Sequence, residues 1–119
     1  MLRHDDSVRL RHMLDHAHEA VKMSQGRQRS DLETDRMLEL SLVRLLEVLG
    51  EAANRVSRQT QEHFDILPWH DIIGLRNRLI HGYNQVDHDI LWDIVRGDLP
   101  RLIEKLEGVV QQLDSEGRS

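Results

Sequence analysis

The sequence predicts an all-α fold, an antiparallel bundle of about five helices that forms a single domain over residues 1–119. Three observations lead to this prediction. Apolar residues recur at the i, i+3, i+4, i+7 spacing of amphipathic helices through most of the chain. The chain has only two prolines and seven glycines, and the stretches between its periodic segments are short. A chain of this length can bury one hydrophobic core but is too short to divide into two domains.

The first helix is predicted to begin near Asp5 or Asp6, because an aspartate side chain can accept hydrogen bonds from the free N–H groups of a first turn. It is expected to stop before Gly26, which can adopt the left-handed conformation that commonly follows a helix. The predicted apolar stripe of this helix consists of Leu10, Met13, Leu14, Ala17 and Val21.

A long second helix is predicted to open at Ser30, since Ser30 followed by Glu33 has the spacing of a capping box. Gly50 lies inside this helix, where a glycine costs about 1 kcal/mol relative to alanine. A close approach by another helix at Gly50 would explain that cost. The predicted apolar stripe consists of Leu38, Leu42, Leu45, Leu46, Leu49, Ala53 and Val56.

Residues 58–67 are predicted to form a linker with one short helical turn. Pro68 suits the first turn of a third helix, because the N–H that proline lacks has no partner there. This helix is expected to carry Trp69, Ile72, Ile73 and Ile80 and to end at Gly82.

Two further helices are predicted after Gly82. Asp87 is expected to cap the fourth helix, and Gly97 is expected to stop it. The last helix is predicted to open at Leu99 and Pro100, with residues 115–119 as a frayed tail.

The composition excludes several classes of protein. The chain has no cysteine, so disulfides and thiolate metal sites are excluded. No apolar run approaches the roughly 18 residues of a membrane span, and charges occupy the N-terminal positions where a signal peptide would be apolar. A cytoplasmic location is therefore expected. The formal charge of −5 disfavours a nonspecific nucleic-acid binder, so any contacts with RNA must be local, and binding to DNA is not expected.

The segment 76–83 gathers four chemically active side chains: Arg76, Asn77, His81 and Tyr83. An arginine can stabilise a phosphate during a displacement, and a histidine can transfer a proton near neutral pH. On one continuous helix Asn77 and His81 would share a face. All four side chains are therefore expected to border one shallow cleft.

Metal-free cleavage of RNA requires a base, an acid and a cation that stabilises the transition state. The segment offers one histidine and one clear arginine, Arg76. A two-fold homodimer would supply two of each and could place base and acid on different chains. A homodimer with the cleft at its interface is therefore expected, with neither a metal ion nor a cofactor.

The pattern Arg-x4-His-x-Tyr, with asparagine after the arginine, resembles the signature of the HEPN superfamily. More narrowly it resembles the HepT-like toxin ribonucleases, which are paired with a minimal nucleotidyltransferase antitoxin in type VII toxin–antitoxin systems. The resemblance extends over residues 8–113, and its flanking segments are 49–53, 68–75, 89–94 and 98–100.

The resemblance implies a metal-independent endoribonuclease toxin whose motifs pair across a dimer. It implies catalytic roles for Arg76 and His81, with Asn77 orienting the histidine or the phosphate. It also implies that Tyr83 can accept AMP from the nucleotidyltransferase, which would block the cleft; a simple phosphate contact by Tyr83 is the other possibility. Another class of function remains open, a non-catalytic helical partner that binds the nucleotidyltransferase.

Each of these residues also has a purely structural interpretation. Arg76 could form a surface salt bridge with Glu51 or Asp71, and His81 could interact with the C-terminal end of a helix dipole. Asn77 could satisfy backbone groups near that end.

Other polar and aromatic residues are not expected to form a site. His12, His16 and His18 include an i, i+4 pair, but they lie off the apolar stripe with no obvious third metal ligand. A solvated helix face is therefore expected there. Trp69 and Trp92 are expected to anchor the core or an interface.

Overall fold

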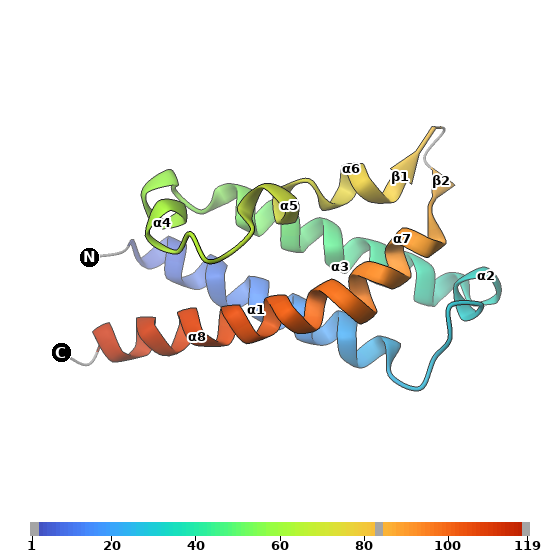
Figure 1. Cartoon of the computed structure of the whole chain (residues 1–119), viewed down its shortest axis with the longest axis horizontal. Coiled ribbons are helices and arrows are strands. Elements are labelled where there is room, and N and C mark those ends of the chain that lie inside the picture. Colours follow the sequence, from blue (N-terminus) through green and yellow to red (C-terminus); the bar gives the residue numbers. More distant parts are fainter. Residues whose placement is uncertain (1–2, 83–84, 118–119) are drawn as a thin grey trace.

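The computed structural model describes residues 3–82 and 85–117. Three long helical rods lie side by side: α1 (His4–Ser24), α3 (Arg36–Arg55), and a rod formed by α7 (His88–Asp93), the π-helical turn η1 (Ile94–Asp98) and α8 (Leu99–Gly117) (Figure 1). Four short helices lie in the segments that connect the rods: α2 (Asp31–Thr34), α4 (Arg58–His63), α5 (Trp69–Ile73) and α6 (Leu75–Leu79). A single two-stranded hairpin, β1 (Ile80–His81) and β2 (Gln85–Val86), completes the part of the chain that the structure describes. The prediction of an all-α fold is confirmed.

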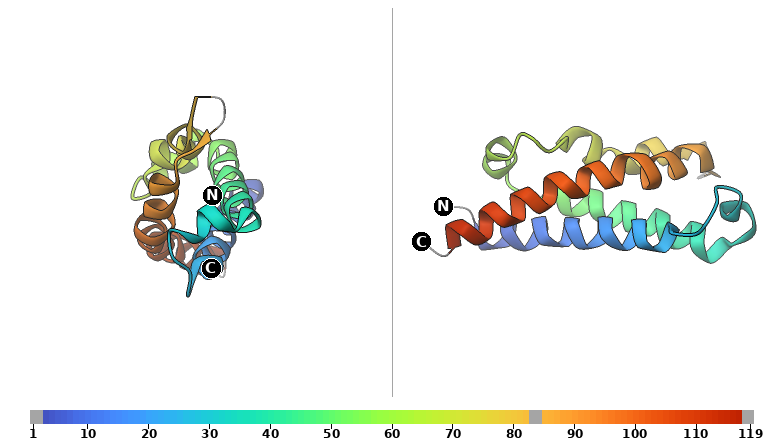
Figure 2. Two further views of the ribbon diagram at one scale, coloured as in Figure 1. Left: turned by 90° about the vertical axis from the view of Figure 1, so that its right-hand side faces the viewer. Right: turned by 60° about the horizontal axis from the view of Figure 1, so that its bottom comes forward.

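The long rods run antiparallel, with α3 and α8 both opposed to α1 (Figure 2). Arg11 of α1 pairs with Asp114 of α8 at 2.5 Å, and His18 pairs with Glu107 at 3.2 Å, so contacts move backwards along α8 as they move forwards along α1. The start of α1 and the end of α8 therefore lie at the same end of the bundle (Figure 1).

The predicted stripes form the core between the rods. A leucine, isoleucine or methionine side chain stabilises the fold by roughly 1.5–3 kcal/mol when it is fully buried. The fully buried residues include Leu10, Met13 and Ala17 of α1, Leu42, Leu46 and Leu49 of α3, and Leu91, Ile94 and Leu106 of the third rod. Trp69 is buried and its indole N–H donates to the Phe64 carbonyl at 3.0 Å, while Trp92 packs partly buried against the core, so both tryptophans are structural anchors.

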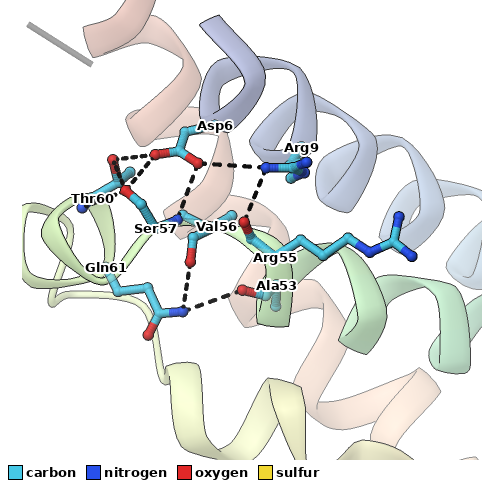
Figure 3. Close-up of polar contacts among 8 residues, drawn as sticks. All are labelled: Asp6, Arg9, Ala53, Arg55, Val56, Ser57, Thr60 and Gln61. Atoms are coloured by element: carbon cyan, nitrogen blue, oxygen red, sulfur yellow. Dashed lines mark hydrogen bonds and ion pairs between the residues drawn. The ribbon is translucent and has the colours of Figure 1, made fainter. Parts of the chain in front are cut away.

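The start of α1 differs from the prediction in the role of Asp6. The helix begins at His4, its N-cap is Arg3, and Asp6 lies buried in the first turn rather than capping it. The Asp6 carboxylate accepts hydrogen bonds from the Ser57 N–H at 3.0 Å, the Ser57 hydroxyl at 2.6 Å and the Thr60 hydroxyl at 2.7 Å (Figure 3). Asp6 therefore ties α1 to the junction of α3 and α4, which local sequence could not indicate. Gly26 does adopt the predicted left-handed conformation, with φ of 74°.

The capping-box prediction at Ser30 is wrong. Ser30 is itself in the helical region and makes no side-chain cap, and the helix that follows it, α2, has only four residues. The long helix α3 is capped instead by Asp35, whose side chain accepts from the Leu38 N–H at 3.1 Å. Serine and aspartate are both good N-caps, so the sequence offered two candidate caps five residues apart. Asp35, the second of them, is the residue that caps the long helix.

Gly50 confirms the prediction of a close approach. A Cβ atom at Gly50 would lie 3.0 Å from the Ile72 carbonyl oxygen, which is closer than side chains normally approach a backbone atom. The α5 segment packs directly on α3 at this point. The predicted short turn within residues 58–67 is also confirmed, as α4.

The predicted single helix from Pro68 to Gly82 is wrong, and this difference shapes the site. The segment is divided at Gly74 into α5 and α6, and the helix ends at Leu79. Ile80 then pairs with Val86 across the hairpin, and both side chains pack partly buried against the core. The packing of this β-branched pair in the hairpin prevails over the helical periodicity of the segment. A strand of two residues is too short to be recognised from the sequence pattern.

The predicted stop at Gly97 is also wrong, since α7, η1 and α8 form one continuous helix. The Leu99 N–H bonds to the Ile94 carbonyl, five residues back, as in a π-helical turn. Pro100 has no N–H and its ring crowds the preceding turn, and a widened turn accommodates it without ending the helix. The last helix extends to Gly117, so the tail predicted from residue 115 begins too early.

Candidate active site

Arg76 lies on the exposed side of α6 and is held by the neighbouring long helix. Its Nε donates to Oε2 of Glu47, on α3, at 3.0 Å. The surface salt bridge considered as the structural interpretation of Arg76 is therefore present, but its partner is Glu47 and not the predicted Glu51 or Asp71; Glu51 is paired with Arg44 on its own helix. The Nε edge of the guanidinium is therefore occupied, and the two terminal nitrogens make no hydrogen bond within the described residues.

His81 lies on β1, and strand alternation places its side chain on the exposed face while Ile80 turns inward. The imidazole Nε2 lies 3.3 Å from Oδ2 of Asp87. The helix C-terminal interpretation of His81 is wrong, because the helix ends two residues earlier at Leu79. His81 is thus fixed by the hairpin and by a carboxylate rather than by a helix dipole.

Asn77 is exposed on α6, and its side chain makes no hydrogen bond within the described part of the chain. The prediction that Asn77 and His81 share one helix face is wrong, because they belong to a helix and a strand. Arg76 and His81 are not joined by a hydrogen bond or ion pair among the described residues; they turn toward α3 and α7 respectively. Tyr83 lies outside the described residues.

Asp87 is a residue of this region whose contact with His81 was not predicted. The sequence indicates it as the cap of α7, which is confirmed, since its Oδ1 accepts from the Ile90 N–H at 3.0 Å. This backbone hydrogen bond, together with the nearby His81, holds the pKa of Asp87 below its usual value despite some desolvation. Asp87 is therefore a charged carboxylate beside the imidazole at neutral pH. The signal available in the sequence was that His81 and Asp87 flank one short turn.

Arg78 lies on the opposite edge of α6, where it pairs with Asp98 of η1 at 3.4 Å. The three polar residues of α6 are therefore dispersed around the helix, with Arg76 facing α3 and Arg78 facing the third rod. Of the two arginines, Arg76 is the one that pairs with a side chain of α3.

Exposed apolar side chains lie on the α3 side of this region. Met37 is 80% exposed and Leu40 is 51% exposed, and with Arg44 and Glu47 they follow one face of α3 at helical spacing. Leu40 also borders a hollow shared with Gln85 and Val86 of the hairpin. Ile73 of α5 is also 36% exposed, and its carbonyl oxygen lies 3.6 Å from the Cβ position at Gly50. Apolar residues of this size that recur on one face mark a surface suited to contact with another protein.

The prediction of a solvated face for the histidines of α1 holds for His12 and His18, which are exposed, but not fully for His16. His12 is exposed and its ring lies 6.2 Å from the ring of His16, which is partly buried. Within residues 3–82 and 85–117 no group of three histidine, aspartate or glutamate side chains is placed to hold a metal ion. Over the same residues, no helix is both long enough and apolar enough to cross a membrane.

The arrangement offers a cation with two free terminal nitrogens and an imidazole backed by a carboxylate, both at the surface. The guanidinium can bind a phosphate, and the imidazole can accept or donate a proton. Their exposure means that a substrate strand could reach both without entering an enclosed cavity.

Comparisons with known proteins agree on one family. A family model described as "Ribonuclease HepT-like" matches residues 13–109. A protein of Methanocaldococcus jannaschii that carries the name "Putative RNase MJ1380" is 30% identical over 107 residues, which cover 90% of this chain and 98% of that protein. A Thermococcus cleftensis protein named "Probable ribonuclease HepT" is 32% identical over 77 residues, or 65% of this chain and 70% of that protein. No solved structure shows a significant match.

Proposed function

The chain belongs to the HepT-like ribonuclease family, and on that premise we propose that it is a metal-independent endoribonuclease acting as a homodimer. The observation that carries the proposal is the pair of exposed motif residues, Arg76 on α6 and His81 on β1. Arg76 and His81 are each oriented by a carboxylate of the same chain, Glu47 and Asp87. Orientation of this kind is useful to a group that must meet a substrate in one geometry.

The proposed reaction is an internal displacement at phosphorus. One histidine removes the proton from a ribose 2′-OH, and the 2′-oxygen forms a bond to phosphorus as the bond to the 5′-oxygen breaks. A second group returns a proton to the departing 5′-oxygen, which leaves a 2′,3′-cyclic phosphate and a 5′-OH. The terminal nitrogens of Arg76 stabilise the additional negative charge on the phosphoryl oxygens.

A homodimer supplies the second proton-transfer group. One chain has a single motif histidine, His81, whereas a two-fold dimer would bring two copies together. The exposed Met37 and Leu40 on α3, on the side that carries the Arg76–Glu47 pair, support a contact between copies there. The composite site would then lie at the junction of two chains, with Asn77 directed at the phosphate or at the histidine of the partner.

The resemblance extends the proposal to a toxin of a type VII pair. The proposed substrate is RNA, and the proposed antitoxin is a minimal nucleotidyltransferase. We also propose that the toxin acts in the cytoplasm and consists of a single domain. Transfer of AMP from ATP to the Tyr83 hydroxyl, with release of pyrophosphate, would add a negative charge and bulk to the motif segment and so repel the RNA backbone. The sequence position of Tyr83, two residues after His81, supports this part of the proposal.

A second function remains the alternative, a non-catalytic partner that binds the nucleotidyltransferase. The specific observation in its favour is the scarcity of aromatic residues, four in the whole sequence, which leaves little for the bases of an RNA strand to stack on. The formal charge of −5 also fits a partner that grips a nucleotide locally and does not bind long RNA.

Cleavage of total RNA in EDTA distinguishes the two functions. We expect the wild type to cut, and Arg76→Ala and His81→Ala each to lower the rate by at least about 100-fold. His18→Ala and Arg11→Ala are the matched controls, because each removes an exposed basic residue paired with a carboxylate far from the motif. If the wild type and both controls cut RNA while Arg76→Ala and His81→Ala do not, the result supports the proposed nuclease function. If no form of the protein cuts while the wild type still forms a stable complex with the nucleotidyltransferase, the alternative holds.

A further inference from the structure

We propose that Asp87 is a positioning residue for His81: its carboxylate holds the Nε2 side of the imidazole and leaves Nδ1 as the nitrogen that exchanges a proton with the substrate. The inference rests on the proposed function, in which His81 transfers a proton. It assigns to Asp87 a role beyond the helix cap that its sequence position indicates.

The two oxygens of this one carboxylate have different tasks. Oδ1 accepts the Ile90 N–H at 3.0 Å and so caps α7, while Oδ2 lies 3.3 Å from Nε2 of His81. The cap fixes the orientation of the carboxylate, and the fixed carboxylate in turn faces the imidazole. A side chain that only capped the helix would need no imidazole within that distance of its second oxygen.

The backbone of Asp87 is itself held from two directions. Its N–H donates to the Leu79 carbonyl at 2.8 Å, which ties it to the last residue of α6. The next residue, His88, is paired with Glu39 of α3, and both of these side chains are largely buried. Asp87 is therefore positioned relative to both α6 and α3, the two helices that carry the Arg76–Glu47 pair.

Asp87 is the carboxylate directed at His81 among the described residues. Three neighbouring charged groups have other partners: Arg76 has Glu47, Arg78 has Asp98, and Asp89 has Arg29. The backbone hydrogen bond from Ile90 keeps the pKa of Asp87 low, so the carboxylate is charged wherever the enzyme would work.

A charged carboxylate at Nε2 has two effects on the proton transfer. It favours the tautomer with hydrogen on Nε2, which leaves the Nδ1 lone pair free to take the 2′-OH proton. It also stabilises the imidazolium that forms when that proton arrives, as the aspartate does in a Ser-His-Asp triad. The proton ends on Nδ1 and Asp87 remains ionised throughout.

Two variants separate this role from the helix cap. Asp87→Asn retains the capping oxygen, since asparagine is as good an N-cap as aspartate, but removes the charge. Asp35→Asn is the matched control, because Asp35 caps α3 in the same way through the Leu38 N–H and does not contact His81. We expect Asp87→Asn to lower kcat for RNA cleavage by about tenfold or more with little change in KM, and Asp35→Asn to leave both unchanged.

A titration that needs no activity completes the test. The carboxyl carbon of Asp87 is followed by NMR against pH in the wild type, in His81→Ala and in the control His18→Ala. Coupling between the two groups is reciprocal, so loss of His81 is expected to raise the pKa of Asp87, whereas loss of His18 is expected to leave it unchanged.

The outcomes are distinguishable. A pKa of Asp87 that does not move in His81→Ala, or an Asp87→Asn protein as active as Asp35→Asn, overturns the role of Asp87. A wild type that cuts no RNA counts against the proposed function instead, while the titration still decides whether Asp87 and His81 act as a pair.

Discussion

Nε of Arg76 donates to Oε2 of Glu47 across 3.0 Å, which joins the motif arginine on α6 to the middle of α3. The side chain of Glu47 is only 23% exposed while that of Arg76 is 58% exposed, so the anchored end of the pair is the carboxylate. The guanidinium is thereby oriented with its terminal nitrogens outward. A rigid helix, and not the flexible arginine stem, sets the place where a phosphate would bind.

This relationship predicts that Glu47→Ala slows RNA cleavage by about tenfold, because the guanidinium is no longer held in one orientation. The free energy of unfolding should change by about 1 kcal/mol or less, because the arginine end of the pair is mostly exposed to solvent. Single-turnover rates and urea unfolding check both parts. Asp98→Ala, which releases Arg78 in place of Arg76, is the control and should retain the wild-type rate of cleavage.

The exposed face of α3 predicts the surface of the proposed dimer. Met37→Glu and Leu40→Glu each place a charge where an apolar contact is expected, and we expect light scattering to report a monomer for either variant at concentrations where the wild type is dimeric. Ile66→Glu is the matched control, since Ile66 is also exposed (60%) but lies after α4, away from the motif. Unchanged dimers of the α3 variants would place the interface elsewhere.

Substitution of Gly50 is expected to lower the stability of the protein, whereas substitution of a glycine with free space around its Cβ position is expected to raise it. Gly50→Val should destabilise the protein by roughly 1–3 kcal/mol, because its side chain must displace the Ile72 carbonyl, 3.0 Å from the Cβ position. Gly108 lies on the exposed side of α8 with nothing within 4 Å of its Cβ position. Gly108→Ala should therefore stabilise by about 1 kcal/mol through helix propensity alone. Thermal and urea unfolding of the two variants test the contrast.

The buried Asp6 predicts a loss of stability in acid. Burial raises the pKa of Asp6, but hydrogen bonds from Ser57 and Thr60 and the charge of Arg9 more than offset it, so the folded-state value lies below the ordinary 3.8. Because the folded value is depressed, the stabilisation is present above pH 3.8 and is lost as pH falls through the folded value.

Unfolding free energies measured between pH 6 and pH 2 are therefore expected to fall less steeply for Asp6→Asn than for the wild type. At neutral pH this variant should be less stable by roughly 1–3 kcal/mol, since an amide cannot accept all three hydrogen bonds that the Asp6 carboxylate accepts from Ser57 and Thr60 (Figure 3). Asp5→Asn, at the exposed neighbouring residue, is the control, and a slope as shallow as that of Asp6→Asn would contradict the assignment.

Helical periodicity was informative where one helix face meets the core along its whole length. Most members of the two long predicted stripes are buried, including Leu10, Met13 and Ala17 of the first and Leu42, Leu46 and Leu49 of the second. The other members Leu14, Val21 and Leu45 are only partly buried, although they still pack against the core. Capping was predictable where one candidate existed, as at Asp87, and failed at Ser30, where Asp35 competed. Local chemistry does not rank two adequate caps.

By itself the sequence determined the helical class, the burial of the long stripes and the identity of the motif residues, because these follow from spacing along one chain segment. Only the tertiary structure decided that the motif helix ends at Leu79, that His81 projects from a strand, and that Glu47 and Asp87 are the partners of Arg76 and His81. The physical reason is the distance along the chain between the residues that interact. A helix stripe is a local pattern, whereas the hairpin and both carboxylate contacts depend on how packing brings α3, α6 and α7 together.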